Sequence, residues 1–341
     1  EVLEQFLVAE LEASGLSGYV VGLSGGIDSA VAAALAVRAV GAGRVTAVAL
    51  PGPSSDPRSL ADAELVARQL GVRLELRDLS QPARQLAAVL GCGEDRPRFG
   101  NLLARLRMAA LFDLARPVPA LVLGTSNKSE ILLGYSTLFG DGAASVQPLG
   151  DVWKTQVFAL GEYLQLPDEV QTKVPTADLW PGQTDAGELG FDYREADPIL
   201  WAHHEAGLDA ERLCAAGFDP RLVERVLNLY RRNRFKWRPT VVARVSSSAI
   251  NIDRILPRNP ERSVAAVRPR PRVSHGRCHP YRQPRRSLAA RPPDARQLRP
   301  DPRRGYPSGA HLAQPRWHHN PHPVLSRAHR TAGAATRHRL H

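Results

Sequence analysis

The chain carries the stretch Val21-Gly22-Leu23-Ser24-Gly25-Gly26-Ile27-Asp28-Ser29-Ala30 near its start. The apolar residues 19–23 predict a buried strand, because uninterrupted apolar runs are typical of strands covered on both faces. The Ala-rich residues 29–40, which stop at Gly41, predict a helix. A Gly- and Ser-rich loop between such a strand and such a helix lies where open α/β sheets bind their ligands.

Predicted strands and helices alternate after this loop. Apolar or alternating runs predict strands at 45–50, 72–79 and 120–124, and helical spacing predicts helices at 60–70, 82–90 and 102–114. From 155 to 234 the pattern is mainly helical and includes an apolar stripe formed by Leu222, Val223, Val226, Leu227 and Tyr230. The order predicts an α/β fold, a Rossmann-like parallel sheet with helices on both faces, followed by a mainly helical C-terminal part.

The loop has the composition of a phosphate-binding loop. Gly25 and Gly26 let the backbone approach a phosphate closely, and the N-terminus of the following helix attracts anions. The loop lacks the Lys of a P-loop and the spacing of G-x-G-x-x-G, which argues against nicotinamide hydride chemistry. Asp28 would repel a phosphate unless a cation lay between them, and Mg²⁺ suits that combination of ligands. The alternative is a plain turn in which Ser24 or Asp28 caps the helix.

The charge is distributed unevenly along the 341 residues. The whole chain carries a net charge of +11, yet residues 261–341 hold 18 Arg, no Lys and 3 acidic residues. Residues 1–260 hold 27 basic and 31 acidic residues, so this part is mildly acidic. A nucleic-acid-binding function inferred from the whole-chain charge would therefore rest on residues 261–341 alone.

The composition predicts a domain over residues 1–258 and a basic tail over 259–341. Residues 261–341 hold 12 of the 28 prolines and 9 of the 11 histidines, without apolar periodicity, so burial there cannot offset the entropy of ordering. Three interpretations stay open, and the composition favours the first, translation of a GC-rich gene out of frame. The others are a solvated tail and a disordered basic arm that contacts nucleic acid nonspecifically.

Two classes of protein are disfavoured by composition. No stretch of about 18 residues lacks a charged side chain, so we expect no transmembrane helix. Cys92, Cys214 and Cys278 share no metal-like spacing and cannot form a disulfide scaffold, so we expect a cytoplasmic protein.

Further motifs follow the loop along the chain. They are Gly100-Asn101-Leu102-Leu103-Ala104-Arg105-Leu106-Arg107-Met108, Gly124-Thr125-Ser126-Asn127-Lys128-Ser129-Glu130, Gly134-Tyr135-Ser136-Thr137, Pro148-Leu149-Gly150-Asp151-Val152-Trp153-Lys154-Thr155, Pro175-Thr176-Ala177-Asp178-Leu179-Trp180, Gly182-Gln183-Thr184-Asp185 and Asn233-Arg234-Phe235-Lys236. The loop resembles the pyrophosphate loop of the N-type ATP pyrophosphatases. The whole set, over about residues 1–258, resembles the ammonia-dependent NAD synthetases of that superfamily.

This resemblance implies a fold, a reaction and a set of partners. The fold is that of the adenine nucleotide alpha-hydrolases. The reaction activates the carboxylate of deamido-NAD with the co-substrate ATP and Mg²⁺, and ammonia then displaces AMP to give NAD. The resemblance also implies a cytoplasmic homodimer. Because only 23 residues precede Ser24, without room for a glutaminase domain, we expect free ammonia to be the nitrogen source.

The resemblance also implies roles for individual residues. Those implied to bind ATP are Gly22, Leu23, Ser24, Gly25, Gly26, Ile27, Asp28, Ser29, Thr125, Lys154 and Thr176. Asp28 and Lys154 would be catalytic, and Asp28 and Glu130 would hold the metal. Arg105 and Lys236 would bind deamido-NAD. Leu138 and Ser145 stand where many relatives have Lys and Asp, so we assign those two positions no role.

Two alternatives from other classes remain at this point. A tRNA-thiolating enzyme would share the loop and use a basic tail on RNA, but Cys92 and Cys214 lie in no catalytic motif. A non-catalytic nucleotide-binding module would keep the loop and could lose Glu130 or Lys154, and both are present.

Overall fold

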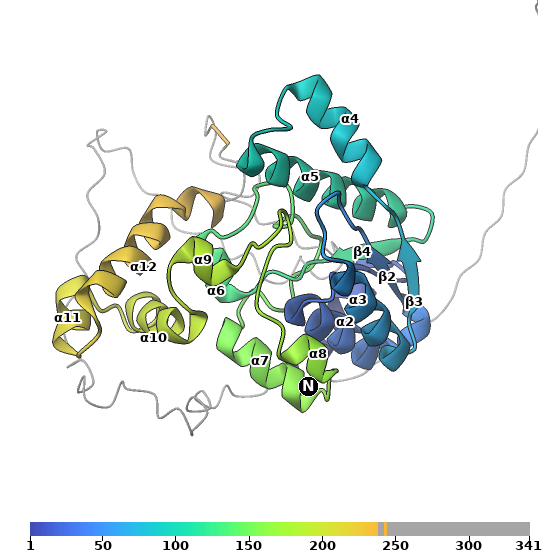
Figure 1. Ribbon diagram of the computed structural model, residues 1–341. Coiled ribbons are helices and arrows are strands. Elements are labelled where there is room, and N and C mark those ends of the chain that lie inside the picture. The colour runs from blue at the N-terminus through green and yellow to red at the C-terminus, as the bar shows by residue number, and fades with distance from the viewer. Residues whose placement is uncertain (238–241, 244–341) are drawn as a thin grey trace, which may run out of the picture. The chain divides into compact units, whose positions relative to one another are not determined.

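The computed structural model describes residues 1–237, 242 and 243, which contain a four-stranded parallel sheet (Figure 1). The strands are β1 (Gly18–Gly22), β2 (Val45–Ala49), β3 (Arg73–Leu76) and β4 (Ala120–Leu123), in the spatial order β3-β2-β1-β4. Val20 of β1 pairs with Thr46 on one side and with Val122 on the other. Since β1 is an inner strand, the loop that follows it lies at the middle of the sheet's carboxyl edge.

Helices cover both faces of this sheet, as predicted. On one face, Tyr19 and Val21 pack in a cluster with side chains of α1 (Val2–Ser14), α2 (Ile27–Val40), α3 (Pro57–Leu70) and α7 (Lys154–Tyr163). On the other face, Val20 packs with Leu111 of α5 (Arg96–Leu114), against which α4 (Ser80–Leu90) lies (Figure 1). Alternate residues of β1 therefore serve opposite layers, as strand geometry requires.

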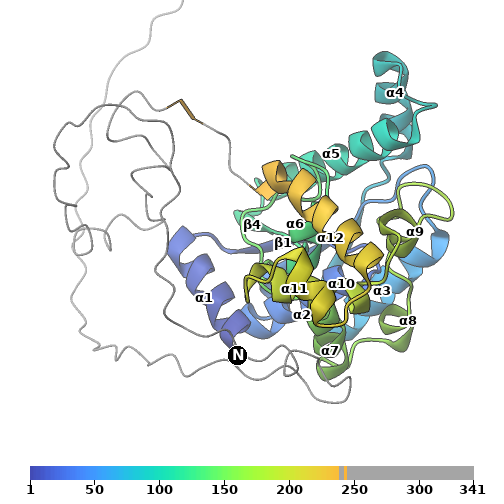
Figure 2. The ribbon, with the colours of Figure 1, turned by 90° about the vertical axis from the view of Figure 1, so that its left-hand side faces the viewer.

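A separate apolar cluster joins the helices of the C-terminal part. It contains side chains of α6 (Lys128–Leu133), α10 (Tyr193–His204), α11 (Ala210–Ala215) and α12 (Pro220–Arg232), and the last three lie beside one another in Figure 2. The short helices α8 (Asp168–Gln171) and α9 (Asp185–Leu189) and the 3-10 turns η1 (Ala42–Arg44) and η2 (Arg234–Trp237) complete the elements. Val223, Val226 and Leu227 of the predicted stripe are buried, which confirms it.

Several element ends differ from the prediction for identifiable reasons. The helices α3 and α5 begin three and six residues earlier than predicted, because Asp56 and Asp95 cap them and a proline occupies their first turns. β3 is shorter than predicted because it is an edge strand whose one partner, β2, ends at Ala49. The N-terminal helix α1 was not predicted.

Two further predictions from the sequence concern membrane-spanning helices and the C-terminal tail. Among residues 1–237, 242 and 243, no helix combines the length and the apolar content that crossing a membrane would need. The proposed boundary between residues 258 and 259, and the tail beyond it, lie outside the described residues.

Candidate active site

The phosphate loop joins the end of β1 to the first turn of α2. Gly25 has a φ of +73°, and a Cβ at this position would lie 2.3 Å from the carbonyl oxygen of Ser59 in α3. Both the backbone conformation and the close approach of α3 therefore require glycine. Gly26 is the N-cap of α2, and the helix begins without a side-chain cap, which leaves its first amides available to an anion.

The two serines of the loop maintain its shape. Ser29 Oγ donates to the Gly26 carbonyl at 2.9 Å and accepts from the Ser24 amide at 3.2 Å. Ser24 Oγ accepts from the Gly26 amide at 3.3 Å. Because α2 begins at Ile27, two residues before the predicted start, Asp28 and Ser29 lie in its first turn.

Asp28, Glu130 and Lys154 meet above the sheet, and we call them the acid–lysine cluster. Lys154 Nζ lies 2.5 Å from Asp28 Oδ2 and 3.1 Å from Glu130 Oε1. The three residues come from the first turns of α2, α6 and α7, which place them together although 126 positions separate Asp28 from Lys154. Asn127, whose side chain caps α6, also donates to Asp28 Oδ1 at 2.8 Å.

Burial and an excess of acid control the protonation of this cluster. Burial, helped by the nearby charges of Asp28 and Asp185, raises the pKa of Glu130 to about 8 against the opposing effect of Lys154. Burial alone would lower the pKa of Lys154, but Asp28 and Glu130 reverse this and raise it above its usual range. Lys154 is only 2% exposed, so an unpaired ammonium there would be costly. Its charge is therefore shared by more than one carboxyl group.

The chemistry of the cluster fits a divalent cation. Three carboxyl groups, those of Asp28, Glu130 and Asp185, act on one ammonium group, and Glu130 therefore keeps a proton that a divalent cation could displace. Mg²⁺ takes carboxylate and phosphate oxygens as ligands. Within the described ranges, no group of three or more His, Cys, Asp or Glu side chains is arranged to hold a metal by itself. A cation bound here would need phosphate oxygens in addition to Asp28 and Glu130.

The buried side chain of Asp197 holds in place the helix starts that carry Glu130 and Lys154. Asp197 of α10 is 0% exposed and accepts from Ser129 Oγ at 2.6 Å and from the amide and hydroxyl of Thr155 at 2.9 and 2.8 Å. Ser129 Oγ in turn accepts from the Lys154 amide at 2.9 Å. These bonds tie α10 to the starts of α6 and α7, which carry Glu130 and Lys154. Asp197 is not among the residues predicted from the sequence, because it lies in no motif.

A pocket of about 510 Å³ opens at the carboxyl edge of the sheet. Its wall includes most of the residues predicted to bind ATP, metal or deamido-NAD: Gly22, Leu23, Ser24, Gly26, Ile27, Asp28, Ser29, Thr125, Glu130, Lys154, Thr176 and Lys236. Gly25 lies behind the wall and shapes the loop. Lys236 Nζ donates to the carbonyls of Gly134 and Ser136 at 2.7 Å each, which fixes the turn after α6.

The two arginines of α5 occupy different environments. Arg105 is exposed and absent from the pocket wall, and its Nη1 lies 3.5 Å from the Asn101 carbonyl. Arg107 lines the pocket, where its Nε donates to the Leu50 carbonyl at 3.0 Å and its Nη2 donates to Ser55 Oγ at 3.2 Å. Burial lowers the pKa of Arg107. The helical spacing that puts Arg107 on the same face as Leu103 and Leu111 could have revealed this from the sequence.

The fold and the site together define a class of protein. A parallel sheet whose carboxyl edge carries a glycine loop, an uncapped helix N-terminus and an acid–lysine cluster is the architecture of a nucleotide-binding α/β protein. The model of the NAD synthase family matches residues 1–240. The chain belongs to the NAD synthase family.

Individual relatives agree with this membership. The chain is 44% identical over 254 residues to the NH(3)-dependent NAD(+) synthetase of Chlorobium phaeovibrioides, covering 74% of this chain and 91% of that protein. Among solved structures, the NH3-dependent NAD synthetase of Campylobacter jejuni aligns with a TM-score of 0.60 and 30% identity, covering 71% of this chain and 96% of the other. The NMN synthetase of Francisella tularensis aligns with a TM-score of 0.62 and 34% identity, covering 71% and 97%.

Proposed function

We propose that this protein is an ammonia-dependent NAD synthetase, a ligase that converts deamido-NAD, ATP and ammonia into NAD, AMP and pyrophosphate. In the first step the nicotinate carboxylate attacks the α-phosphorus of ATP, and pyrophosphate leaves. In the second step ammonia attacks the carbonyl carbon of the adenylate, and AMP leaves. The observation that carries the proposal is the acid–lysine cluster beside the phosphate loop, in a chain of the NAD synthase family.

The phosphate loop and Lys154 supply the electrostatics of the first step. Residues 22–29 surround the triphosphate, whose charge the amides at the start of α2 attract. The Lys154 ammonium, fixed by Asp28 and Glu130, is proposed to offset the charge that develops on the departing pyrophosphate. Thr125 and Thr176, which both line the pocket, complete the contacts proposed for ATP.

Mg²⁺ is proposed as the cation held by Asp28 and Glu130, where it would neutralise phosphate charge. The excess of carboxyl groups around Lys154 supports this assignment. Lys236 is proposed to contact deamido-NAD from the pocket wall. Arg105 is also proposed to contact deamido-NAD, although it faces away from the pocket in the single chain.

Three further proposals concern the whole protein. The enzyme domain is proposed to span residues 1–258, with residues 259–341 as a tail outside it. A homodimer is supported by exposed apolar side chains on and near α4 and α5, including Val89, Phe112 and Val118, which a second subunit could cover. A cytoplasmic location is supported by Cys92 and Cys214, which are both free thiols.

The experiment is an assay of the purified protein with ATP, Mg²⁺, deamido-NAD and ammonium. We expect NAD, AMP and pyrophosphate in equal amounts; ADP and phosphate would contradict an adenylate intermediate. Replacing ammonium by glutamine tests the nitrogen source, and we expect turnover only with ammonium. Because the Francisella relative is named an NMN synthetase, nicotinate mononucleotide is included as a competing acceptor. We expect deamido-NAD to have the higher kcat/KM.

A further inference from the structure

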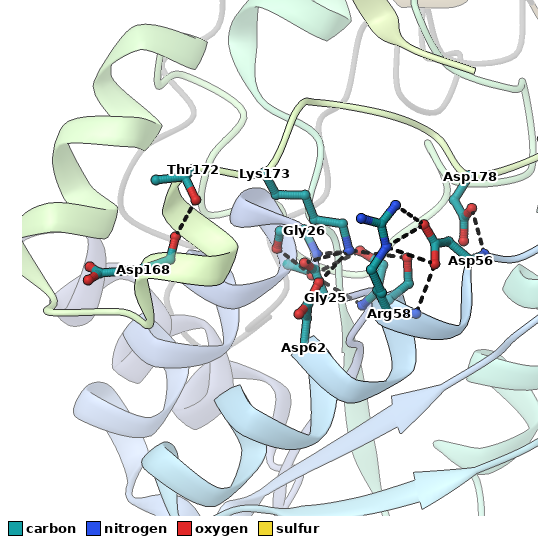
Figure 3. A network of polar contacts seen from close by, with 12 residues as sticks. Gly25, Gly26, Asp56, Arg58, Asp62, Asp168, Thr172, Lys173 and Asp178 are labelled. Atoms are coloured by element: carbon teal, nitrogen blue, oxygen red, sulfur yellow. Dashed lines mark hydrogen bonds and ion pairs between the residues drawn. The ribbon is translucent and has the colours of Figure 1, made fainter. Parts of the chain in front are cut away.

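Lys173 makes a set of contacts that the proposed mechanism does not use. It follows α8, and its Nζ donates to Asp62 Oδ2 at 2.7 Å, to Ser59 Oγ at 3.1 Å and to the Gly25 carbonyl at 3.4 Å (Figure 3). The Lys173 and Asp62 side chains are 20% and 16% exposed. One ammonium group therefore joins three segments: the phosphate loop, the first turns of α3, and the chain that leaves α8.

The hydrogen bond from Lys173 to Gly25 lies where the phosphate loop packs directly against α3. A Cβ on Gly25 would lie 2.3 Å from the Ser59 carbonyl and 2.9 Å from Asp62 Cβ, so the loop rests directly on α3. Lys173 binds both partners of that approach, because it donates to the Gly25 carbonyl and to the side chains of Ser59 and Asp62. Because the peptide unit is planar, fixing the Gly25 carbonyl also fixes the direction of the Gly26 amide, at the N-cap of α2.

The chain that connects α8 to α9 contributes to the pocket wall, and we call residues 173–185 the crossing segment (Figure 1). Residues 173–180, including Thr176, line the pocket. A second bond to the start of α3 holds this segment, because Asp178 Oδ1 accepts from the Asp56 amide at 3.1 Å (Figure 3). The Asp185 amide donates to the Pro175 carbonyl at 3.0 Å and closes the segment on itself. Lys173 is thus the first of two attachments between the crossing segment and α3.

We infer that Lys173 is a positioning residue for ATP: its ion pair with Asp62 aligns the phosphate loop with Thr176 of the crossing segment. The inference rests on the proposed function, since it concerns the ATP side of that reaction. Lys173 is not a catalytic residue, because it acts on ATP only through the phosphate loop and the crossing segment that it holds in place. Its removal should weaken the binding of ATP and leave the binding of deamido-NAD unchanged.

The test is kinetic and uses the full chain. We expect Lys173→Met to raise KM for ATP about tenfold, as misalignment of binding groups commonly does, while KM for deamido-NAD stays within about twofold. Titration of ATP and Mg²⁺ without deamido-NAD should show the same loss of affinity. Lys173→Arg should restore most of it, because Arg keeps the charge. Asp62→Asn should act in the same direction, and K173M/D62N should be no worse than K173M alone.

Arg38→Met and Glu4→Gln are the matched controls. They remove an ion pair whose Glu4 is 19% exposed, close to the 16% of Asp62, and which joins α1 to α2 away from the pocket. We expect both controls to leave KM for ATP unchanged. If K173M lowers the midpoint of thermal unfolding much more than R38M does while its affinity for ATP is normal, the Lys173–Asp62 pair is only structural and the inference is wrong.

Two further results separate the inference from the proposed function. An unmodified chain that forms no NAD would refute the proposed function, and the ATP titration would still test Lys173. An active unmodified chain whose K173M variant has an unchanged KM for ATP, or an equally raised KM for deamido-NAD, would refute the inference alone.

Discussion

Two charged clusters flank the phosphate loop, and they differ in the balance of their charges. In the acid–lysine cluster, Lys154, which is 2% exposed, pairs with the two carboxyl groups of Asp28 and Glu130, and the carboxyl group of Asp185 acts on it from outside the cluster. In the other cluster, Lys173 pairs with the single carboxylate of Asp62, and both side chains are partly exposed. A balanced pair is complete without a ligand, whereas a buried excess of acid is not. The difference indicates that the first cluster receives a cation and phosphates, and that the second holds the backbone which surrounds them.

The largest expected effect comes from removing acid from the acid–lysine cluster. Asp28→Asn and Glu130→Gln should each lower kcat by on the order of 10²-fold or more, because each leaves phosphate charge less neutralised. Steady-state kinetics at saturating ATP, deamido-NAD and ammonium measure this. Near-normal kcat in both variants would show that Asp28 and Glu130 do not hold the metal. The acid–lysine cluster would then not differ from the Lys173–Asp62 pair in receiving a cation.

The excess of acid also predicts how stability depends on pH. The pKa of Glu130 rises from 4.5 to about 8 on folding, so between these values the folded protein holds a proton that the unfolded chain has lost. The free energy of unfolding should therefore fall as the pH rises from about 5 to about 8, by on the order of a few kcal/mol. The raised pKa of Asp185 acts in the same sense, while the raised pKa of Lys154 lies above this range.

Denaturant unfolding of the ligand-free protein at several pH values measures this dependence. Glu130→Gln is the matched variant, because it cannot lose a proton and should flatten the profile. A free energy of unfolding that stays level from about pH 5 to about pH 8 would show that Glu130 is ionised in the folded protein, and the acid–lysine cluster would then hold no extra proton.

Replacing Gly25, which approaches α3 closely, should have a smaller effect. It tests the part of the phosphate loop that Lys173 holds. Gly25→Ala should lower the free energy of unfolding by roughly 1–3 kcal/mol and weaken ATP binding, because both the φ of +73° and the Ser59 carbonyl oppose a Cβ. Gly15→Ala is the control, since Gly15 has a φ of +68° and no atom within 4 Å of an added Cβ. Thermal unfolding and ATP titration of both variants separate the backbone strain from the contact. Equal effects in both would show that the contact with α3 contributes nothing.

The sequence predicted the parts of the site that are local. The run 19–29 contains its own strand, turn and helix start, so its fold and place could be inferred without distant contacts. Glu130 was also predictable, because the carboxyl ends of parallel strands meet at one edge and α6 follows β4 directly.

The remaining parts depend on contacts that no local pattern contains. Lys173 and Asp62 are 111 positions apart, and Asp197 lies 68 positions from Ser129. Arg107 is a different case, because helical spacing was available and places it on the face of α5 that also carries Leu103 and Leu111, while the role of Arg105 stays a prediction. The resemblance singled out Arg105, whereas the structure places Arg107 in the pocket wall.

The smallest expected effect concerns the 18 arginines of residues 261–341. We expect bound ligands, and not these arginines, to supply the positive charge that the acid–lysine cluster lacks. Deleting residues 261–341 should then leave the ammonia-dependent rate within about twofold, because every proposed site residue precedes the deletion. Residues 1–260 hold more acidic than basic residues, so the deletion should also remove most nonspecific binding to DNA, and the binding that the full chain shows should weaken steeply with salt. A shortened chain that folds and binds ATP but forms no NAD, when the full chain does form it, would make residues 261–341 part of the working enzyme, and the charge balance of the acid–lysine cluster would have to include their arginines.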